Sequence, residues 1–329
     1  AAALRRYIEA LPLGRKHVVT GQRVEIPVHY DGEDLAEVAQ ILGIDVAELI
    51  ARHTGEDYSV AFCGFAPGFA YLSGGDARLN VPRRSTPRTK VPAGSVAIAG
   101  TFSAVYPNDT PGGWQLLGRT EVPMWDLQRN PPALLQPGMR VRFVDAATVG
   151  VTGAVSASNA EAEKSAAASS PAAAEAQRSQ ASMRVRAAGL QTLVQDAGRA
   201  GQAGQGVSAS GALDQGAMRR ANRLLGNDEN LPVLESAAGG LQLQSVGATV
   251  VAVTGATGTL NILACDGRSW PAERNTALAL NDGDVLQLGE PATGLRSYVA
   301  VRGGWLVEHV LGSASTDTLA RIGPPALAA

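Results

Sequence analysis

Cysteine and long apolar runs are scarce in this chain, and each shortage argues against a class of protein. Only Cys63 and Cys265 occur in 329 residues, and neither belongs to a CxxC pair. We therefore expect no disulfide framework and no structural zinc site, and a reducing compartment such as the cytoplasm. No apolar run is long enough to span a bilayer and no signal-peptide pattern occurs, so we expect no membrane partner.

Lysine is scarce as well, and the charge balance is close to neutral. The formal net charge is -2, and basic charge comes almost wholly from arginine because the lysines are only Lys16, Lys90 and Lys164. This balance provides no overall electrostatic footprint for nucleic acid. We expect no nucleic-acid partner.

Several catalytic motifs are missing from the sequence. There is no GxxxxGK[ST] phosphate-binding loop, and GVSAS at 206–210 lacks the last glycine of the GxSxG nucleophile elbow. The four histidines have no metal-ligand spacing, and the biotin-acceptor pattern AMKM is absent. We therefore expect the chain itself to hold no metal and no cofactor, so that any catalysis would need activation by a partner.

Composition divides the chain at residues 151–182, which are nearly all Ala, Ser, Glu and Gln. Such a segment buries too little apolar surface to offset the entropy of ordering it, so we predict a flexible linker. Before the linker, 34–43 and 44–55 have helical spacing and each ends in glycine, with Leu35, Val38, Ile41 and Leu42 expected on the inner face of the first helix. The pair has the form of a helix-turn-helix, but its second helix is too acidic to favour DNA.

From residue 58 onwards, and again after the linker, short apolar runs are separated by Gly and Pro. This pattern indicates many short strands in a barrel or sandwich. In the second part, 213–227 predicts one helix with Asp214 at its N-cap.

The stretch 62–120 crowds glycine and proline around four large rings, Phe65, Phe69, Tyr71 and Trp114. It also sets four cations among three prolines: Arg83, Arg84, Arg88 and Lys90. Rigid cationic loops suit a small anionic or carbonyl-bearing ligand. Tight turns with solvated arginines explain the residues equally well.

Further polar residues have one structural and one functional interpretation each. Gln115 could bind a lactam or ureido group and Arg119 a carboxylate, or Trp114 could be a core anchor and Arg119 a solvated strand end. Gln195, Asp196 and Arg199 could contact substrate or could form a local Asx turn. Glu235, in an apolar context, is the carboxylate for which burial would raise the pKa. His53 fits packing better than proton transfer.

Long collinear motifs resemble two known families. FCGFAPGFAYL (62–72), LNVPRRSTPRTKVPAGSVAIAG (79–100) and PGGWQLLGRT (111–120) resemble the allophanate hydrolase subunit 1 family, which includes the B subunit of 5-oxoprolinase and a sporulation-kinase inhibitor. After the linker, TLVQDAGRAG (192–201), GVSASGALD (206–214), ANRLLGN (221–227) and YVAVRGGW (298–305) resemble the subunit 2 family, which includes the C subunit of 5-oxoprolinase.

The resemblance implies a mainly β protein with a small α/β N-terminal part and two cyclophilin-like β-barrel modules joined by the flexible linker. The expected domains are 1–57 (α/β), 58–150 (subunit-1 type β domain), 151–182 (linker) and 183–329 (subunit-2 type β domain). Family members extend further at both ends, so the resemblance implies an incomplete first subdomain and an incomplete last domain.

The function implied by the resemblance is that of a fused B–C component of ATP-dependent 5-oxoprolinase, which opens 5-oxo-L-proline to L-glutamate. ATP would be bound by a separate partner that is similar to the A subunit of 5-oxoprolinase. The second interpretation is the carboxyltransferase component of a urea carboxylase or allophanate hydrolase system, with biotin on another domain. The third is a binding protein that inhibits a histidine kinase. Homo-oligomer formation is left open.

The resemblance also assigns roles to the candidate residues. The expected catalytic residues are Glu235, Lys90 and His53. The expected substrate contacts are Arg83, Arg84, Arg88, Trp114, Gln115, Arg119, Gln195, Asp196 and Arg199.

Overall fold

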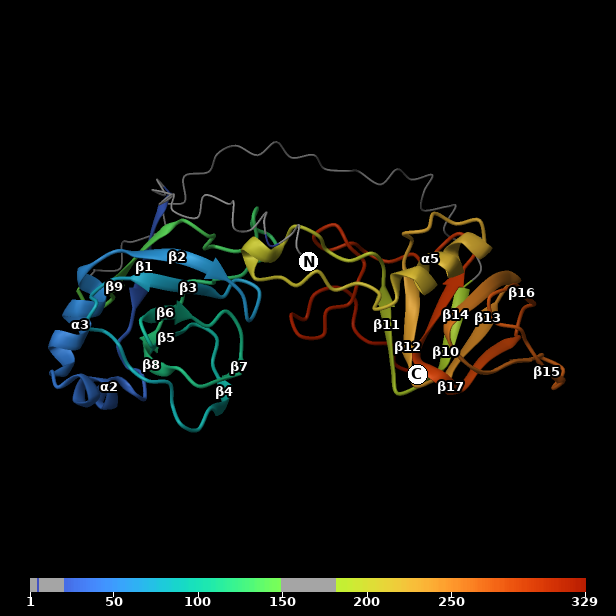
Figure 1. Cartoon of the computed structure of the whole chain (residues 1–329), viewed down its shortest axis with the longest axis horizontal. Helices are drawn as coiled ribbons and strands as arrows, with labels where there is room; N and C mark the ends of the chain where they lie inside the picture. Colours follow the sequence, from blue (N-terminus) through green and yellow to red (C-terminus); the bar gives the residue numbers. More distant parts are fainter. Residues whose placement is uncertain (1–4, 6–20, 149–181) are drawn as a thin grey trace. The chain divides into compact units, whose positions relative to one another are not determined.

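The computed structural model describes Arg5, residues 21–148 and residues 182–329. The predicted linker, 151–182, lies outside the described residues except for Ser182, which begins a strand. The described residues form two compact units (Figure 1). The first contains the residues up to Thr148 together with Gly204–Gly206, and the second contains the remainder from Ser182 onwards.

The first unit contains a seven-stranded sheet that nearly closes into a barrel. The strand order is β1 (Arg23–Val28), β9 (Arg140–Asp145), β2 (Tyr58–Cys63), β3 (Ala70–Gly74), β6 (Phe102–Val105), β5 (Ser95–Ala99) and β8 (Gln115–Arg119). Strands β1 and β9 are parallel, and the other pairs in this order are antiparallel. His29, just after β1, exchanges both backbone hydrogen bonds with Arg119 of β8, at 2.8 and 2.9 Å. This bridge joins the two ends of the sheet.

A two-stranded ribbon, β4 (Arg88–Val91) with β7 (Thr110–Gly112), accompanies this sheet. The sheet encloses a core whose alternation is visible along β1, where Val24, Ile26 and Val28 are buried. Because side chains alternate along a strand, the intervening residues face outward.

The two predicted helices are confirmed as α2 (Leu35–Leu42) and α3 (Val46–Gly55). Helix α2 contacts β8 and helix α3 contacts β9, and both lie at one end of the unit (Figure 1). Gly43 adopts φ +69° after α2, and the Asp45 carboxylate accepts a hydrogen bond from the Glu48 N–H at the start of α3. The expected position of Ile41 was wrong: its side chain is exposed, because the inner face of α2 passes through Leu35, Val38 and Ala39.

The second unit is built around two long strands, β14 (Thr249–Leu263) and β17 (Val285–Val301). Its sheet has the order β10 (Ser182–Ala188), β13 (Leu241–Val246), β17, β12 (Val233–Ala237) and β11 (Gln191–Gln195). Strand β14 pairs with β17 and also with β15 (Ser269–Pro271) and β16 (Ala277–Leu280). A short 3-10 turn covers Ala203–Gln205, of which Ala203 belongs to the second unit and Gly204 and Gln205 to the first.

Helix α5 (Gln215–Leu224) packs on β14 and β17 in the second unit (Figure 1). Ala217, Met218 and Ala221 are buried in one cluster with Tyr298 and Ala300. The Asp214 carboxylate accepts a hydrogen bond from the Ala217 N–H, as predicted for the N-cap. The predicted class, mainly β with two β modules, is confirmed. Among the described residues, no helix combines the length and apolarity of a membrane span.

The turn at Gly32 lies so close to β8 that a larger residue at this position should destabilise the first unit. A Cβ on residue 32 would lie 2.3 Å from the Leu116 carbonyl oxygen and 2.4 Å from the Leu117 carbonyl carbon. Gly32→Ala should therefore lower the free energy of unfolding by about 1–3 kcal/mol, the usual cost of overpacking. Urea denaturation monitored by tryptophan fluorescence measures the change.

Gly55→Ala is the matched control, because a Cβ at residue 55 would meet nothing within 4 Å and the residue ends a helix. It should stabilise the unit by about 0.5–1 kcal/mol. Equal midpoints for the two variants would contradict this account of Gly32.

Candidate functional site

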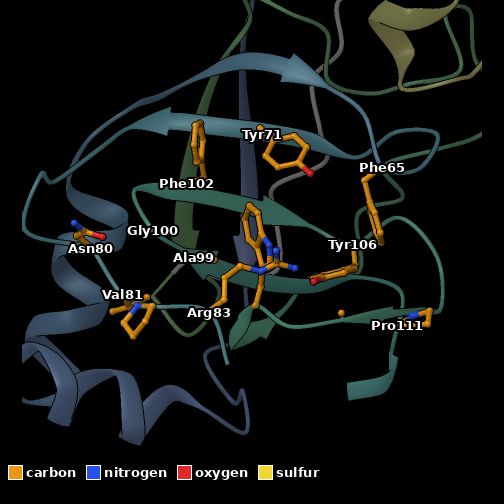
Figure 2. Close-up of a pocket in the computed structure, with 13 residues that line it drawn as sticks. Phe65, Tyr71, Asn80, Val81, Arg83, Ala99, Gly100, Phe102, Tyr106 and Pro111 are labelled. Atoms are coloured by element: carbon orange, nitrogen blue, oxygen red, sulfur yellow. The ribbon is translucent and has the colours of Figure 1, made fainter. Parts of the chain in front are cut away.

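The first unit contains a cavity of about 460 Å³ beside β5, β6 and β7. Figure 2 shows Phe65 and Tyr106 on one side, Asn80 and Val81 on the other, and Arg83 between them. The lining residues are Phe65, Tyr71, Asn80, Val81, Pro82, Arg83, Ala99, Gly100, Phe102, Tyr106, Pro111, Gly112 and Trp114.

The wall of this cavity is a packed set of aromatic rings centred on the buried Phe69. The ring centroid of Phe69 lies 5.1 Å from Tyr71, 5.3 Å from Tyr106 and 5.7 Å from Trp114, each in an edge-to-face arrangement. Such pairs are favourable because the positive ring edge meets the negative ring face. The rings therefore form a rigid apolar surface suited to a flat ligand.

Phe65 at the edge of the cavity has a strained backbone. Its φ is +69°, which is rare for a bulky residue, and its ring is about half exposed. The ring nevertheless packs edge-to-face against Phe69 and Tyr106, at 5.1 and 6.2 Å. Strain of this kind is held by surrounding structure and concentrates at functional sites.

Arg83 contributes an uncompensated positive charge to the cavity. Within residues 21–148 and 182–329 it forms no salt bridge, although both of its arginine neighbours in the loop do. Burial raises the pKa of Tyr106, against the opposing effects of a Trp114 backbone hydrogen bond and the nearby Arg83 charge. A cation beside a neutral phenol and aromatic walls can bind a small planar anion.

Arg84 and Arg88 point to Asp34 and do not line the cavity. Arg84 Nη1 lies 2.6 Å from Asp34 Oδ1, and Arg88 donates to both carboxylate oxygens at 2.8 and 2.9 Å. The Leu116 N–H adds a third donor at 2.7 Å. Burial alone would raise the pKa of Asp34, but the hydrogen bonds from Arg88 and Leu116 and the two arginine charges outweigh it and lower the pKa. The expected role of both arginines as substrate contacts stays a prediction.

Lys90 and Arg119 are exposed and ion-paired outside the cavity. Lys90 Nζ lies 2.8 Å from Asp109, whereas Arg119 contacts Asp31 at 2.9 Å and Glu121 at 2.8 Å. Trp114 does line the cavity. Gln115 is buried beside it, donating to the Pro82 carbonyl at 3.4 Å, and its amide oxygen has no partner among the described residues.

His53 lies in the core of the first unit. Its Nδ1 is 2.7 Å from the Tyr30 hydroxyl, its Nε2 is 3.1 Å from Ser103 Oγ, and its ring stacks on Phe143 at 4.5 Å. Burial lowers the pKa of His53 to about 3. The imidazole is therefore neutral at physiological pH and is not among the groups lining the cavity.

In the second unit, Gln195, Asp196 and Arg199 tie the end of β11 to residues 310–316. Asp196 accepts from Ser313 Oγ at 2.6 Å and from the Ala314 N–H at 2.7 Å. Burial would raise the pKa of Asp196, but these hydrogen bonds, with those from Ser315 and Gly198, lower it. Arg199 donates to the carbonyls of Val310 and Ser315, and Gln195 to that of Thr316.

Glu235 on β12 is buried and ion-paired. Its Oε1 accepts from Arg296 Nε at 2.7 Å and its Oε2 from the Leu213 N–H at 2.9 Å. The sequence patterns did not identify Arg296, Asn80, Phe102 or Tyr106 as candidate site residues. Tyr106 could have been identified because it lies close to the PGGW motif at 111–114. The pairing of Arg296 with Glu235 could not, because it depends on the register between β12 and β17.

No group of three His, Cys, Asp or Glu side chains among the described residues is arranged to hold a metal ion. In the first unit, Arg83 and the aromatic wall border one cavity, and this cavity is the candidate ligand site.

Two family matches cover the two parts of the chain. Residues 1–135 match the carboxyltransferase domain, subdomain C and D, and residues 205–329 match the carboxyltransferase domain, subdomain A and B.

Named relatives agree with this division. The chain is similar to the 5-oxoprolinase B subunit of Bacillus subtilis, with 48% identity over 135 residues, 40% of this chain and 56% of that protein. It is also similar to the 5-oxoprolinase C subunit of Escherichia coli, with 43% identity over 136 residues, 41% of this chain and 42% of that protein. A urea amidolyase of Lachancea kluyveri is 38% identical over 136 residues, 41% of this chain and 7% of that protein.

The crystal structure of TTHA0988 resembles almost the whole chain. The TM-score is 0.77 with 36% identity, over 98% of this chain and 61% of that one. The chain thus spans less than two thirds of the length of these relatives.

The Asp34 ion pairs lead to a second stability prediction. Asp34→Asn leaves two arginines without their buried carboxylate, and breaking a buried pair typically costs about 3–5 kcal/mol. Chemical denaturation should therefore show a large loss. Asp31→Asn, which removes the exposed partner of Arg119, is the matched control and should leave the midpoint nearly unchanged. Similar losses in both variants would refute the special role of Asp34.

The buried His53 predicts a pH dependence of stability. Because the pKa of His53 falls to about 3 in the folded state, from 6.5 when unfolded, only the unfolded chain binds this proton between those values. Stability should therefore decrease as pH falls below about 6.5, by about 2 kcal/mol at pH 5 from this group. His53→Gln should flatten the slope between pH 7 and 5 in urea titrations.

The exposed His29 provides the control, through His29→Gln. A slope that is unchanged in the His53 variant, or flattened equally in both variants, would show that other groups control the pH dependence.

Proposed function

We propose that this chain, which belongs to the carboxyltransferase-domain family, is a fused B–C component of an ATP-dependent 5-oxoprolinase. Its first part matches subdomains C and D of that domain, and its second part matches subdomains A and B. The reaction would open 5-oxo-L-proline to L-glutamate together with a separate A subunit. The observation that carries the proposal is the presence, in one chain, of regions similar to both the B and the C subunits of 5-oxoprolinase.

The Arg83 cavity suits this substrate class. 5-Oxoproline is a small, nearly flat ring that bears one carboxylate. The Arg83 guanidinium would bind the carboxylate in a bidentate manner, and the face of the ring would pack on the aromatic wall around Trp114 and Tyr71. Removal of water by these rings would strengthen the ion pair.

The chain would bind and orient the substrate, and a partner would supply the activation. A lactam carbonyl is a poor electrophile, so water would add to its carbon only after the carbonyl oxygen has been activated. Transfer of a phosphoryl group from ATP, bound to the A subunit, to that oxygen would provide the activation and release ADP. Addition of water and cleavage of the ring C–N bond would then give an acyl phosphate, whose hydrolysis would release phosphate and L-glutamate. Fixing the carboxylate on Arg83 would hold the lactam in one orientation for both steps.

A carboxyltransferase role in a urea carboxylase system is the second candidate, favoured by the similarity to urea amidolyase. Urea has no carboxylate, so Arg83 would then contact the carboxyl group of carboxybiotin carried by another domain. The two candidates differ in the substrate that Arg83 recognises.

Arg83→Gln tests the proposal. Loss of a charge-assisted hydrogen-bonded pair of about 1.5–3 kcal/mol should raise the KM for 5-oxoproline by about ten- to a hundredfold. The assay is glutamate release from 5-oxoproline and ATP by the full chain mixed with the purified A subunit.

Arg78→Gln is the matched control, because Arg78 is exposed and pairs with Asp76 outside the cavity. Glutamate production by the A subunit that does not increase when the wild-type chain is added would sink the proposed function. An unchanged KM in Arg83→Gln would remove Arg83 from the site.

A further inference from the structure

A second cavity, of about 340 Å³, lies in the second unit, where β14 and β17 are bulged. The register between the two strands shifts on either side of Thr257, and Gly255 has φ +88°. A Cβ on Gly255 would lie 2.4 Å from the Arg296 carbonyl oxygen, so the close approach of the strands requires glycine. Bulges commonly redirect side chains beside functional sites.

Arg296 supplies hydrogen-bond donors to this cavity. Its Nε is held by the buried Glu235 carboxylate at 2.7 Å, and that carboxylate is itself fixed by the Leu213 N–H. Among the described residues, the terminal guanidinium nitrogens of Arg296 make no hydrogen bond. Arg296 lines the cavity and is partly exposed, so these donors are oriented but unused.

Asp214 supplies an acceptor to the same cavity. Its Oδ1 caps helix α5 through the Ala217 N–H at 2.9 Å, and its backbone N–H donates to the Tyr298 hydroxyl at 2.8 Å. In the described part of the chain, Oδ2 accepts no hydrogen bond. Asp214 also lines the cavity, so a fixed donor and a fixed acceptor border one space.

The charges select against an anion. Arg296 is already paired with Glu235, and Asp214 adds a carboxylate to the cavity lining, so these three groups carry a net formal charge of -1. A carboxylate or phosphate ligand would be repelled, unlike a ligand in the Arg83 cavity. An uncharged group with one acceptor and one donor matches Arg296 and Asp214.

We propose that this cavity binds an uncharged amide, whose carbonyl oxygen accepts from Arg296 and whose N–H donates to Asp214. A cyclic amide fits because its cis geometry places the oxygen and the N–H on the same side. The exposed Leu213 and Leu295 at the rim offer apolar contact for the ring carbons. The argument uses only residues of the second unit, so it does not depend on the proposed 5-oxoprolinase function.

The test measures binding of 2-pyrrolidinone, a neutral lactam, to the full chain by ligand-observed NMR titration. N-methyl-2-pyrrolidinone retains the carbonyl but lacks the N–H, so the wild-type chain should bind it about tenfold more weakly. Asp214→Asn keeps a good helix N-cap but can turn the free acceptor into a donor. That variant should lose the preference for the N–H lactam.

Arg268→Gln is the matched control, because Arg268 is exposed, pairs with Asp266 and does not line this cavity, and it should leave 2-pyrrolidinone binding unchanged. A double variant, Glu235→Gln with Arg296→Gln, removes both buried charges together and should abolish binding while the helix signal in circular dichroism persists. Absence of 2-pyrrolidinone binding to the wild-type chain, or equal affinity for the two lactams, would overturn the proposal. So would unchanged selectivity in Asp214→Asn. None of these results would affect the glutamate-release test of the proposed function.

Discussion

The buried carboxylate of Asp34 is the interaction on which the geometry of the first cavity depends. It receives Arg84 and Arg88 from the loop before and within β4, and the Leu116 N–H from β8. These bonds hold the loop at Arg84 and at Arg88, on either side of Pro87. The Arg84 N–H also donates to the Gly113 carbonyl. Arg83 therefore has a fixed backbone while its own side chain, within the described residues, stays without an ion pair. Arg84 and Arg88 thus position the backbone that carries Arg83.

The second unit uses buried carboxylates in the same way. Asp196 accepts hydrogen bonds from hydroxyl and backbone donors of Ser313 to Ser315, which ties this irregular segment to the end of β11. Glu235 fixes Arg296 against β12. In each case the carboxylate is satisfied by several donors, which is the condition under which a buried charge is tolerated. The groups that remain available for a ligand, Arg83, Arg296 and Asp214, are those that these networks orient or leave unpaired.

The two cavities differ in charge, and this difference separates their ligand classes. The first presents an unpaired arginine among aromatic rings, whereas the second presents an arginine already neutralised by Glu235 next to a further carboxylate. Anion binding fits the first, and recognition of a neutral hydrogen-bonding group fits the second.

Local patterns in the sequence determined the helices and the β class. The spacing and terminal glycines of 34–43 and 44–55, and Asp214 before 215–224, were sufficient because capping and helix periodicity act over a few residues. The aromatic residues at the first cavity, Phe65, Tyr71 and Trp114, were also evident from their motifs. Tertiary structure alone decided which arginine is free. Arg83, Arg84 and Arg88 look alike in sequence, and only a carboxylate about fifty residues earlier in the chain distinguishes them. The same holds for Arg296, because ion pairing across strands depends on register, which the pattern of short apolar runs does not specify.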